Sequence, residues 1–116
     1  MFGSMFSSIP EVNAPQLADW MDDDSQSFRI IDVREIQEIA QGMVPGSEPV
    51  PLRTLPARLS ELDRDEKFVL VCRSGARSAQ AVMFMQQNGF ENVYNLRGGI
   101  MGWAGSNLPI AQPVAA

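Results

Sequence analysis

The sequence predicts a single α/β domain in which helices cover both faces of a parallel sheet. Two short apolar runs rich in β-branched residues, 28–34 and 67–71, are typical of strands buried on both faces. Strand-like and helix-like segments alternate along the chain, which favours right-handed crossovers between parallel strands. With 116 residues, of which 45% are hydrophobic, the chain is long enough for one hydrophobic core and too short for two.

Local signals define the other elements in order. A short edge strand is expected within 9–12, and Asn13 is a suitable N-cap for a helix over 14–21. The proline-rich segment 43–52 predicts a loop with at most a short strand. Apolar residues at helical spacing predict further helices over 35–42, 54–62 with Thr54 as its cap, 78–88 and 98–105. Residues 92–96 predict a third clear strand. We expect an ordered domain over 9–110, with flexible ends at 1–8 and 111–116.

Composition excludes several classes of function. The net charge of -5 argues against binding to nucleic acid, which needs a basic surface. No apolar run has the length of a membrane helix and the first residues lack a signal-peptide pattern, so we expect a cytoplasmic protein without membrane contact. Residues 1–66 hold thirteen acidic and five basic side chains, whereas residues 67–116 hold one acidic and four basic ones. The second half therefore suits a local site for a small anion.

The only cysteine of the chain, Cys72, stands at the end of an apolar run and before a polar loop. The loop and the start of the following helix read Arg73, Ser74, Gly75, Ala76, Arg77 and Ser78. A glycine-containing turn that opens a helix directs backbone N–H groups towards one point, and the helix N-terminus adds partial positive charge. Such surroundings lower a thiol pKa, and Arg73 and Arg77 can hold an anionic substrate. A buried cysteine that only fills the core would not require this loop.

The absence of histidine limits how Cys72 can be activated. It excludes Cys-His pairs, Ser-His-Asp triads and nearly every zinc site. The thiol must then depend on backbone dipoles and arginines. We expect no metal and no cofactor.

These segments in order resemble a known family. "IIDVRE", "GMVPGS", "VLVCRSGARSAQA", "GFENVYNLRGGIMGW" and "LPI" are similar to the successive segments of single-domain rhodaneses, which are sulfurtransferases. The resemblance spans roughly residues 9–110. It implies a five-stranded, mostly parallel sheet with helices on both faces, and a persulfide on Cys72 cradled by Arg73 to Arg77. Many relatives have His-Ile-Pro-Gly where this chain has Met43-Val44-Pro45-Gly46, which leaves substrate or partner preference open.

Supporting roles are expected for residues at other strand ends. Asp32 and Arg34 are expected to form buried polar contacts at the end of the first apolar strand, and a pair between Asp32 and Arg77 is a further hypothesis. Gly98 and Gly99 are expected to permit a tight turn beside the site. Met43, Met101 and Trp103 are interpreted as rim or core residues.

Three functions remain to be compared. Sulfur transfer from thiosulfate or a persulfide to a thiol, cyanide or a protein acceptor is the leading hypothesis. Phosphatase or arsenate reductase chemistry is disfavoured, because only four residues separate Cys72 from Arg77 and no aspartate stands in an obvious general-acid position. A non-catalytic binding or sulfur-carrier module is the third hypothesis.

Overall fold

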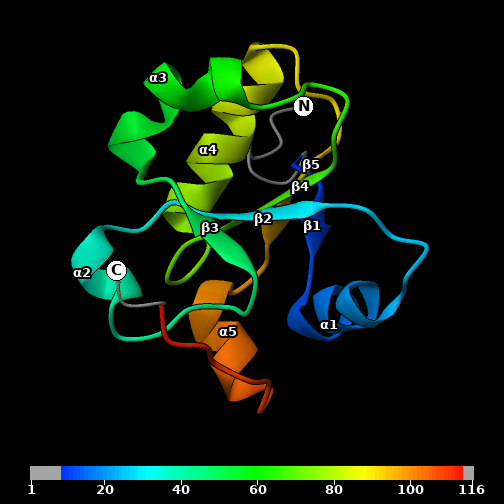
Figure 1. The fold of residues 1–116 in the computed structure, drawn as a ribbon, viewed down its shortest axis with the longest axis vertical. Helices are drawn as coiled ribbons and strands as arrows, with labels where there is room; N and C mark the ends of the chain where they lie inside the picture. The colour runs from blue at the N-terminus through cyan, green and yellow to red at the C-terminus, as the bar shows by residue number, and fades with distance from the viewer. Residues whose placement is uncertain (1–8, 114–116) are drawn as a thin grey trace, which may run out of the picture.

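The computed structural model describes residues 9–113, which form a five-stranded sheet with every strand parallel to its neighbours. Its strands are β1 (Glu11–Val12), β2 (Arg29–Asp32), β3 (Ser47–Pro49), β4 (Phe68–Val71) and β5 (Val93–Leu96). Their order across the sheet is β1-β5-β4-β2-β3, as can be followed in Figure 1. The α/β class and the five-stranded parallel sheet are thus confirmed. The short strands β1 and β3 form the two edges, and β4 lies in the centre.

The helices form two layers, one on each side of the sheet. They are α1 (Ala14–Asp22), α2 (Ile36–Ile39), α3 (Leu55–Arg58), α4 (Ala76–Gln87) and α5 (Gly99–Gly105), with 3₁₀ turns η2 (Leu52–Thr54) and η3 (Leu59–Glu61). Figure 1 shows α3 and α4 on one side of the sheet, and α1 and α5 on the other. Phe68 and Leu70 pack into the core beneath α4, whereas Val69 and Val71 pack into the core with Leu17 and Trp103. Strand β4 is therefore buried on both faces, as its sequence predicts.

The helix starts agree with the sequence in one case and differ in another. Asn13 caps α1 through a capping box, in which Oδ1 accepts from Gln16 N at 2.8 Å and Gln16 Oε1 accepts from Asn13 N at 2.9 Å. The expected single helix over 54–62 is instead the succession η2, α3 and η3. Thr54 does not cap it, because its hydroxyl donates to Pro51 O at 2.7 Å.

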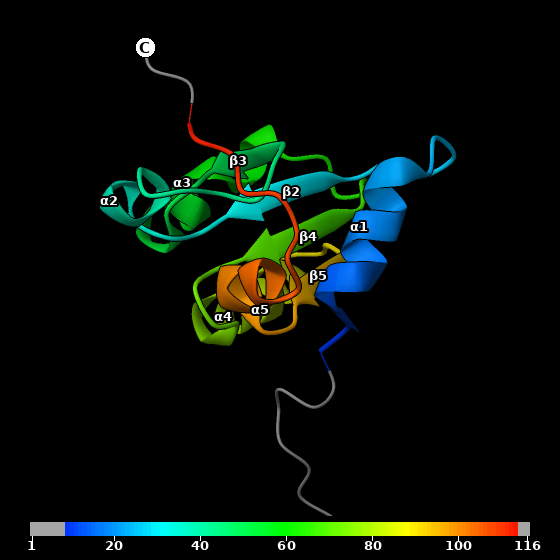
Figure 2. The same cartoon turned by 90° about the horizontal axis from the view of Figure 1, so that it is seen from below.

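The C-terminal segment is more ordered than the sequence indicates. Ala111, expected to begin a flexible tail, forms an antiparallel bridge with Met43 through two backbone hydrogen bonds of 2.8 Å. Figure 2 shows this segment running from α5 towards the β3 side of the molecule. Hydrogen-bonded structure thus reaches Ala111, while residues 1–8 and 114–116 of the ends predicted to be flexible lie outside the described residues. Within residues 9–113, no helix has the length and apolar character needed to span a membrane.

Candidate active site

Cys72 lies directly after the central strand β4, at the edge of the sheet where parallel strands present their carboxyl ends. The residue is only 1% exposed. The chain turns through Arg73, Ser74 and Gly75 before α4 begins at Ala76. Gly75 is the N-cap with a φ of 108°, a conformation that side chains disfavour, so the turn needs glycine there. The sequence expectation of a strand–loop–helix unit around the cysteine is confirmed.

The Cys72 sulfur is surrounded by hydrogen-bond donors. Gly75 N donates to Sγ at 3.1 Å, and Ser78 Oγ lies 3.3 Å from Sγ. Burial is the largest single influence and raises the pKa of the Cys72 thiol, but hydrogen bonds to the thiolate, from the Ser78 hydroxyl when it is turned towards Sγ and from the backbone of Ser78, Gly75 and Ser74, outweigh it. The net result is a pKa below the ordinary thiol value. Neutral donors therefore make the thiolate easier to form at this site than in a free thiol.

Asn95 supports the loop from the neighbouring strand β5 and was not singled out by the sequence analysis. It is 4% exposed, its Nδ2 donates to Gly75 O at 3.1 Å, and its Oδ1 accepts from Ser78 Oγ at 2.5 Å. A signal for it existed, because Asn95 is the one amide in the otherwise apolar and aromatic run 93–96. A polar side chain inside a buried strand must find partners.

The first turn of α5 also holds the loop. Ile100 N donates to Cys72 O at 2.9 Å, and Met101 N donates to Arg73 O at 3.1 Å. Gly99 has a φ of 60°, and a Cβ there would lie 2.5 Å from Cys72 O. The tight turn expected at Gly98 and Gly99 is confirmed, and the close approach of two backbones explains why glycine is required at residue 99.

The hypothesis of an Asp32–Arg77 pair is wrong, because each residue has another partner. Asp32 is fully buried and accepts from the Arg34 side chain, with Nη2 to Oδ2 at 2.8 Å and Nε to Oδ1 at 3.0 Å. Arg77 makes a two-pronged ion pair with Glu38 of α2, at 2.8 Å and 2.7 Å. The hydrogen bonds from Arg77 lower the pKa of Glu38 to about 2.

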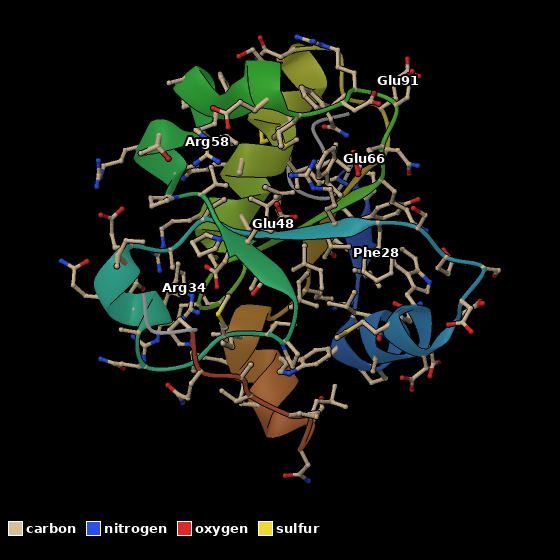
Figure 3. The ribbon with its side chains drawn as sticks, in the orientation of Figure 1. Phe28, Arg34, Glu48, Arg58, Glu66 and Glu91 are labelled. Carbon is tan, nitrogen blue, oxygen red and sulfur yellow. The ribbon has the colours of Figure 1, made fainter. Side chains whose placement is uncertain are left out.

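Arg34 confirms the expectation of buried polar contacts at the end of β2. Besides binding Asp32, its guanidinium donates to Gly42 O at 2.8 Å and to Glu38 O at 3.3 Å. Figure 3 shows Arg34 beside α2. The side chain thereby ties the end of β2 to α2 and to the segment that follows it.

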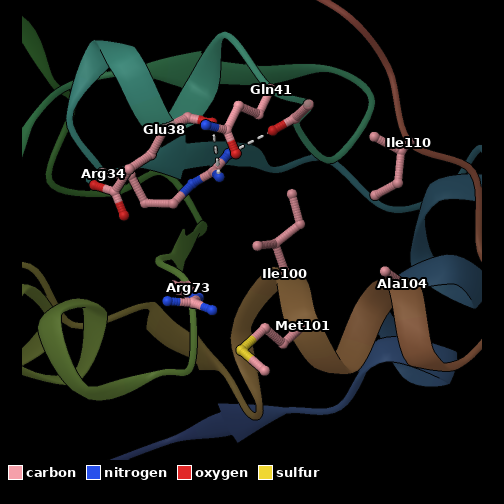
Figure 4. Close-up of a pocket in the computed structure, with 9 residues that line it drawn as sticks. Arg34, Glu38, Gln41, Arg73, Ile100, Met101, Ala104 and Ile110 are labelled. Carbon is pink, nitrogen blue, oxygen red and sulfur yellow. Dashed lines mark hydrogen bonds between the residues drawn. The ribbon is translucent and has the colours of Figure 1, made fainter.

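A groove of about 520 Å³ opens beside the cysteine loop. Arg73 lies on one side of it, and Ile100, Met101, Ala104 and Ile110 contribute an apolar side, as Figure 4 shows. Among the described residues, Arg73 makes no side-chain hydrogen bond and no ion pair. Of the three candidate rim residues, Met101 is 55% exposed and lines the groove, whereas Met43 and Trp103 are buried.

Comparison with known proteins assigns this arrangement to a family. A model of the rhodanese-like domain matches residues 13–106. The chain belongs to the rhodanese-like family. The match runs from α1 to α5, so it includes strands β2 to β5 and the whole cysteine loop.

Individual members of the rhodanese-like family are similar over most of the chain. A protein of Allochromatium vinosum named "Sulfurtransferase" is 46% identical over 90 residues, which are 78% of this chain and 84% of that protein. A Bacillus subtilis protein named "Putative sulfur carrier protein YrkF" is 36% identical over 99 residues, 85% of this chain and 53% of that protein. The crystal structure of a rhodanese-related protein from Thermoplasma volcanium superposes with a TM-score of 0.81 at 31% identity, covering 90% of this chain and 99% of that one. These relatives support a sulfurtransferase-type enzyme.

Proposed function

We propose that the protein transfers a sulfane sulfur through a persulfide on Cys72. The observation that carries the proposal is the ring of donors around Sγ, which stabilises negative charge on sulfur in a buried position. Thiosulfate or a persulfide serves as the sulfur donor. A thiol, cyanide or a partner protein serves as the acceptor.

The first half-reaction loads the cysteine. The Cys72 thiolate attacks the outer sulfur of thiosulfate, a bond forms between Sγ and that sulfur, and the sulfur–sulfur bond of thiosulfate breaks. Sulfite leaves with the bonding electron pair, so the total charge is unchanged and the terminal sulfur carries the negative charge. The loop N–H groups then face a larger anion than the thiolate, with Arg73 as the nearby unpaired cation.

The second half-reaction empties the cysteine. A thiolate or cyanide attacks the terminal sulfur, and Cys72 leaves as a thiolate that the same donors stabilise. Because the donor product leaves before the acceptor reacts, the proposal implies double-displacement kinetics.

Phosphatase or arsenate reductase chemistry has less support. Asp32 at the end of β2 is paired with Arg34, and Glu38 of α2 is paired with Arg77. Neither carboxylate is free to protonate a leaving group. A sulfur-carrier role is compatible with the proposal, because a carrier also needs the loaded cysteine.

Intact-mass measurement tests the proposal. After incubation with thiosulfate the protein should gain one sulfur atom, and cyanide should remove it with release of thiocyanate. Cys72→Ser should show neither change while keeping the wild-type circular dichroism spectrum. An aryl phosphate serves as the control substrate, and its hydrolysis at a rate above that of sulfur transfer would overturn the proposal in favour of the phosphatase alternative.

A further inference from the structure

Ser78 has one hydroxyl proton and two candidate acceptors. Its Oγ lies 2.5 Å from Asn95 Oδ1 and 3.3 Å from Cys72 Sγ, and the residue is fully buried. A hydroxyl donates one hydrogen bond at a time, although it can also accept. Ser78 therefore cannot donate to Asn95 and to Cys72 at once.

The orientation of the Asn95 amide is fixed by its other contact. Nδ2 donates to Gly75 O at 3.1 Å, so Oδ1 must face Ser78. A flipped amide would place its oxygen against the Gly75 carbonyl oxygen, which offers no donor. Among the described residues, the Ser78 hydroxyl is thus the only side-chain donor to Asn95 Oδ1.

The protonation state of Cys72 then decides which acceptor receives the proton. With a neutral thiol, Ser78 donates to Asn95 at the shorter distance, and the thiol can donate weakly to Ser78 Oγ. With a thiolate, donation to Sγ gains the stronger, charge-assisted bond, but it leaves Oδ1 of a buried Asn95 without a donor. Asn95 therefore makes ionisation of Cys72 less favourable than the same site would be without it.

We propose that Asn95 is a positioning residue that competes with Cys72 for the single hydroxyl proton of Ser78 and so tunes how readily the thiol ionises. The charged groups around this contact are Arg77 of α4 with its partner Glu38, the Asp32–Arg34 pair at the end of β2, and Arg73 of the loop. Strand β5 and α5 contribute no ionisable side chain within 93–96 other than Tyr94, and none within 99–105. The competition is therefore separable from these charges by substitution of neutral residues alone.

For sulfur transfer, this inference rests on the proposed function. Cys72 is the attacking group when the sulfur arrives and the leaving group when it departs, and a more stable thiolate slows attack while it speeds departure. A hydroxyl that turns away from Sγ when sulfur is bound and back towards it when the thiolate forms serves both halves. Asn95 holds the hydroxyl in the first of these positions.

A double-mutant cycle on the thiol pKa tests the competition. The thiolate absorbance is followed against pH, and since Cys72 is the only cysteine, subtraction of the Cys72→Ser curve, which retains Tyr94, isolates the Cys72 signal. Asn95→Ala should lower the midpoint by about one pH unit, a tenfold larger acid dissociation constant. Ser78→Ala should raise the midpoint, and Ser78→Thr should restore it. Asn92→Ala, an exposed residue beside the same strand, should leave the midpoint unchanged.

The double variant separates competition from a mere change in loop shape. In the Ser78→Ala background, Asn95→Ala should no longer lower the midpoint, because no hydroxyl proton remains to be released. An equal fall in both backgrounds, or no fall in the wild-type background, would overturn the inference. Asn95→Val, whose β-branched side chain suits a strand, carries the same expectation if the alanine variant fails to fold. No sulfur donor is used, so the result is independent of whether the protein transfers sulfur.

Discussion

Strands β2 and β4 are neighbours that end at the same edge of the sheet, yet their last polar groups meet different surroundings. Asp32 is fully buried, and its two carboxyl oxygens accept hydrogen bonds from the guanidinium of Arg34. Cys72 is a neutral or weakly acidic group, equally buried, and its sulfur meets neutral N–H and O–H donors. The end of β2 carries an ion pair between Asp32 and Arg34, whereas the residue that follows β4 has an ionisable sulfur that takes part in no ion pair.

The difference separates a structural polar contact from the group that we propose to be reactive. A buried carboxylate whose lone pairs are occupied by arginine cannot take part in chemistry without breaking that pair, which is costly. A sulfur stabilised by backbone dipoles keeps its lone pairs available and gains stabilisation whenever negative charge appears. Strand-end position alone therefore does not define a catalytic residue, and the partners decide.

The largest expected effect is the loss of stability when the Asp32–Arg34 ion pair at the end of β2 is removed. Asp32→Ala should lower the free energy of unfolding by about 3–5 kcal/mol, because it leaves the buried Arg34 charge without its partner. Urea denaturation measures this, and Asp32→Asn provides a variant that keeps the shape of the side chain. Glu61→Ala, which removes an exposed pair with Arg58, should cost about 0–1 kcal/mol.

Cys72→Ser is the matching test at the end of β4. It should leave the urea midpoint close to that of the wild-type protein, because the hydroxyl can accept from the same donors. A loss of stability as large as that of Asp32→Ala would mean that the cysteine is also a packing residue, and the contrast between the two ends would then fail.

An intermediate effect is expected at the two loop arginines, which the sequence analysis treated alike. Arg77 is neutralised by Glu38, whereas Arg73 is not paired, so Arg73→Gln should reduce kcat/KM for thiosulfate by about tenfold, equivalent to ~1.4 kcal/mol. The double variant Glu38→Gln with Arg77→Gln preserves net charge and should change it far less. An organic hydropersulfide, which gives up its outer sulfur with a thiol as the leaving group and lacks the double charge of thiosulfate, is the control donor, and its use should depend less on Arg73.

Ionic strength provides a second test of the difference between Arg73 and Arg77. The preference for thiosulfate that depends on Arg73 should shrink as ionic strength rises, because exposed charges are screened over about 10 Å at 0.1 M. Losses of equal size at Arg73 and at the neutral double variant, on both donors, would mean that the arginines only hold the loop.

The smallest expected effect concerns the acid stability of the Glu38–Arg77 pair. The pKa of Glu38 falls from 4.5 to about 2 because Arg77 donates two hydrogen bonds to it. A depressed pKa stabilises the fold above pH 4.5, and this contribution is lost as the pH falls from 4.5 towards 2. The pair is partly exposed, so the contribution is about 1 kcal/mol or less.

Glu38→Gln should flatten this part of the stability curve relative to wild type, as measured by urea unfolding between pH 5 and pH 2 (about the window of the shift). The amide keeps the capping contact with Glu35 N, so helix α2 should remain intact. Arg77→Gln should produce the same flattening. A variant curve parallel to that of wild type would show that the pair contributes nothing to stability.

The parts of the site that follow from the sequence are those that lie together along the chain. Cys72, Gly75 and Ser78 are a continuous strand–loop–helix unit, and local signals place them correctly. The partners of Arg77 and Ser78 are distant in sequence, 39 and 17 residues away. Several acidic side chains could have met Arg77, and only the packing of α2 against the loop selects Glu38. The bridge between Ala111 and Met43 has the same origin, because pairing with a distant segment leaves no local pattern.

The close contact at Gly99 has a dynamic consequence for the whole site. Because the Cys72 and Arg73 carbonyl oxygens accept from Ile100 N and Met101 N, the loop cannot lift away without breaking its two hydrogen bonds to the first turn of α5. We therefore expect the exchange of these two amide protons with solvent to follow opening of the cysteine loop. The amide protons of Ile100 and Met101 are each held by a carbonyl oxygen 28 residues earlier in the chain, so their exchange rates measure how often the cysteine loop opens.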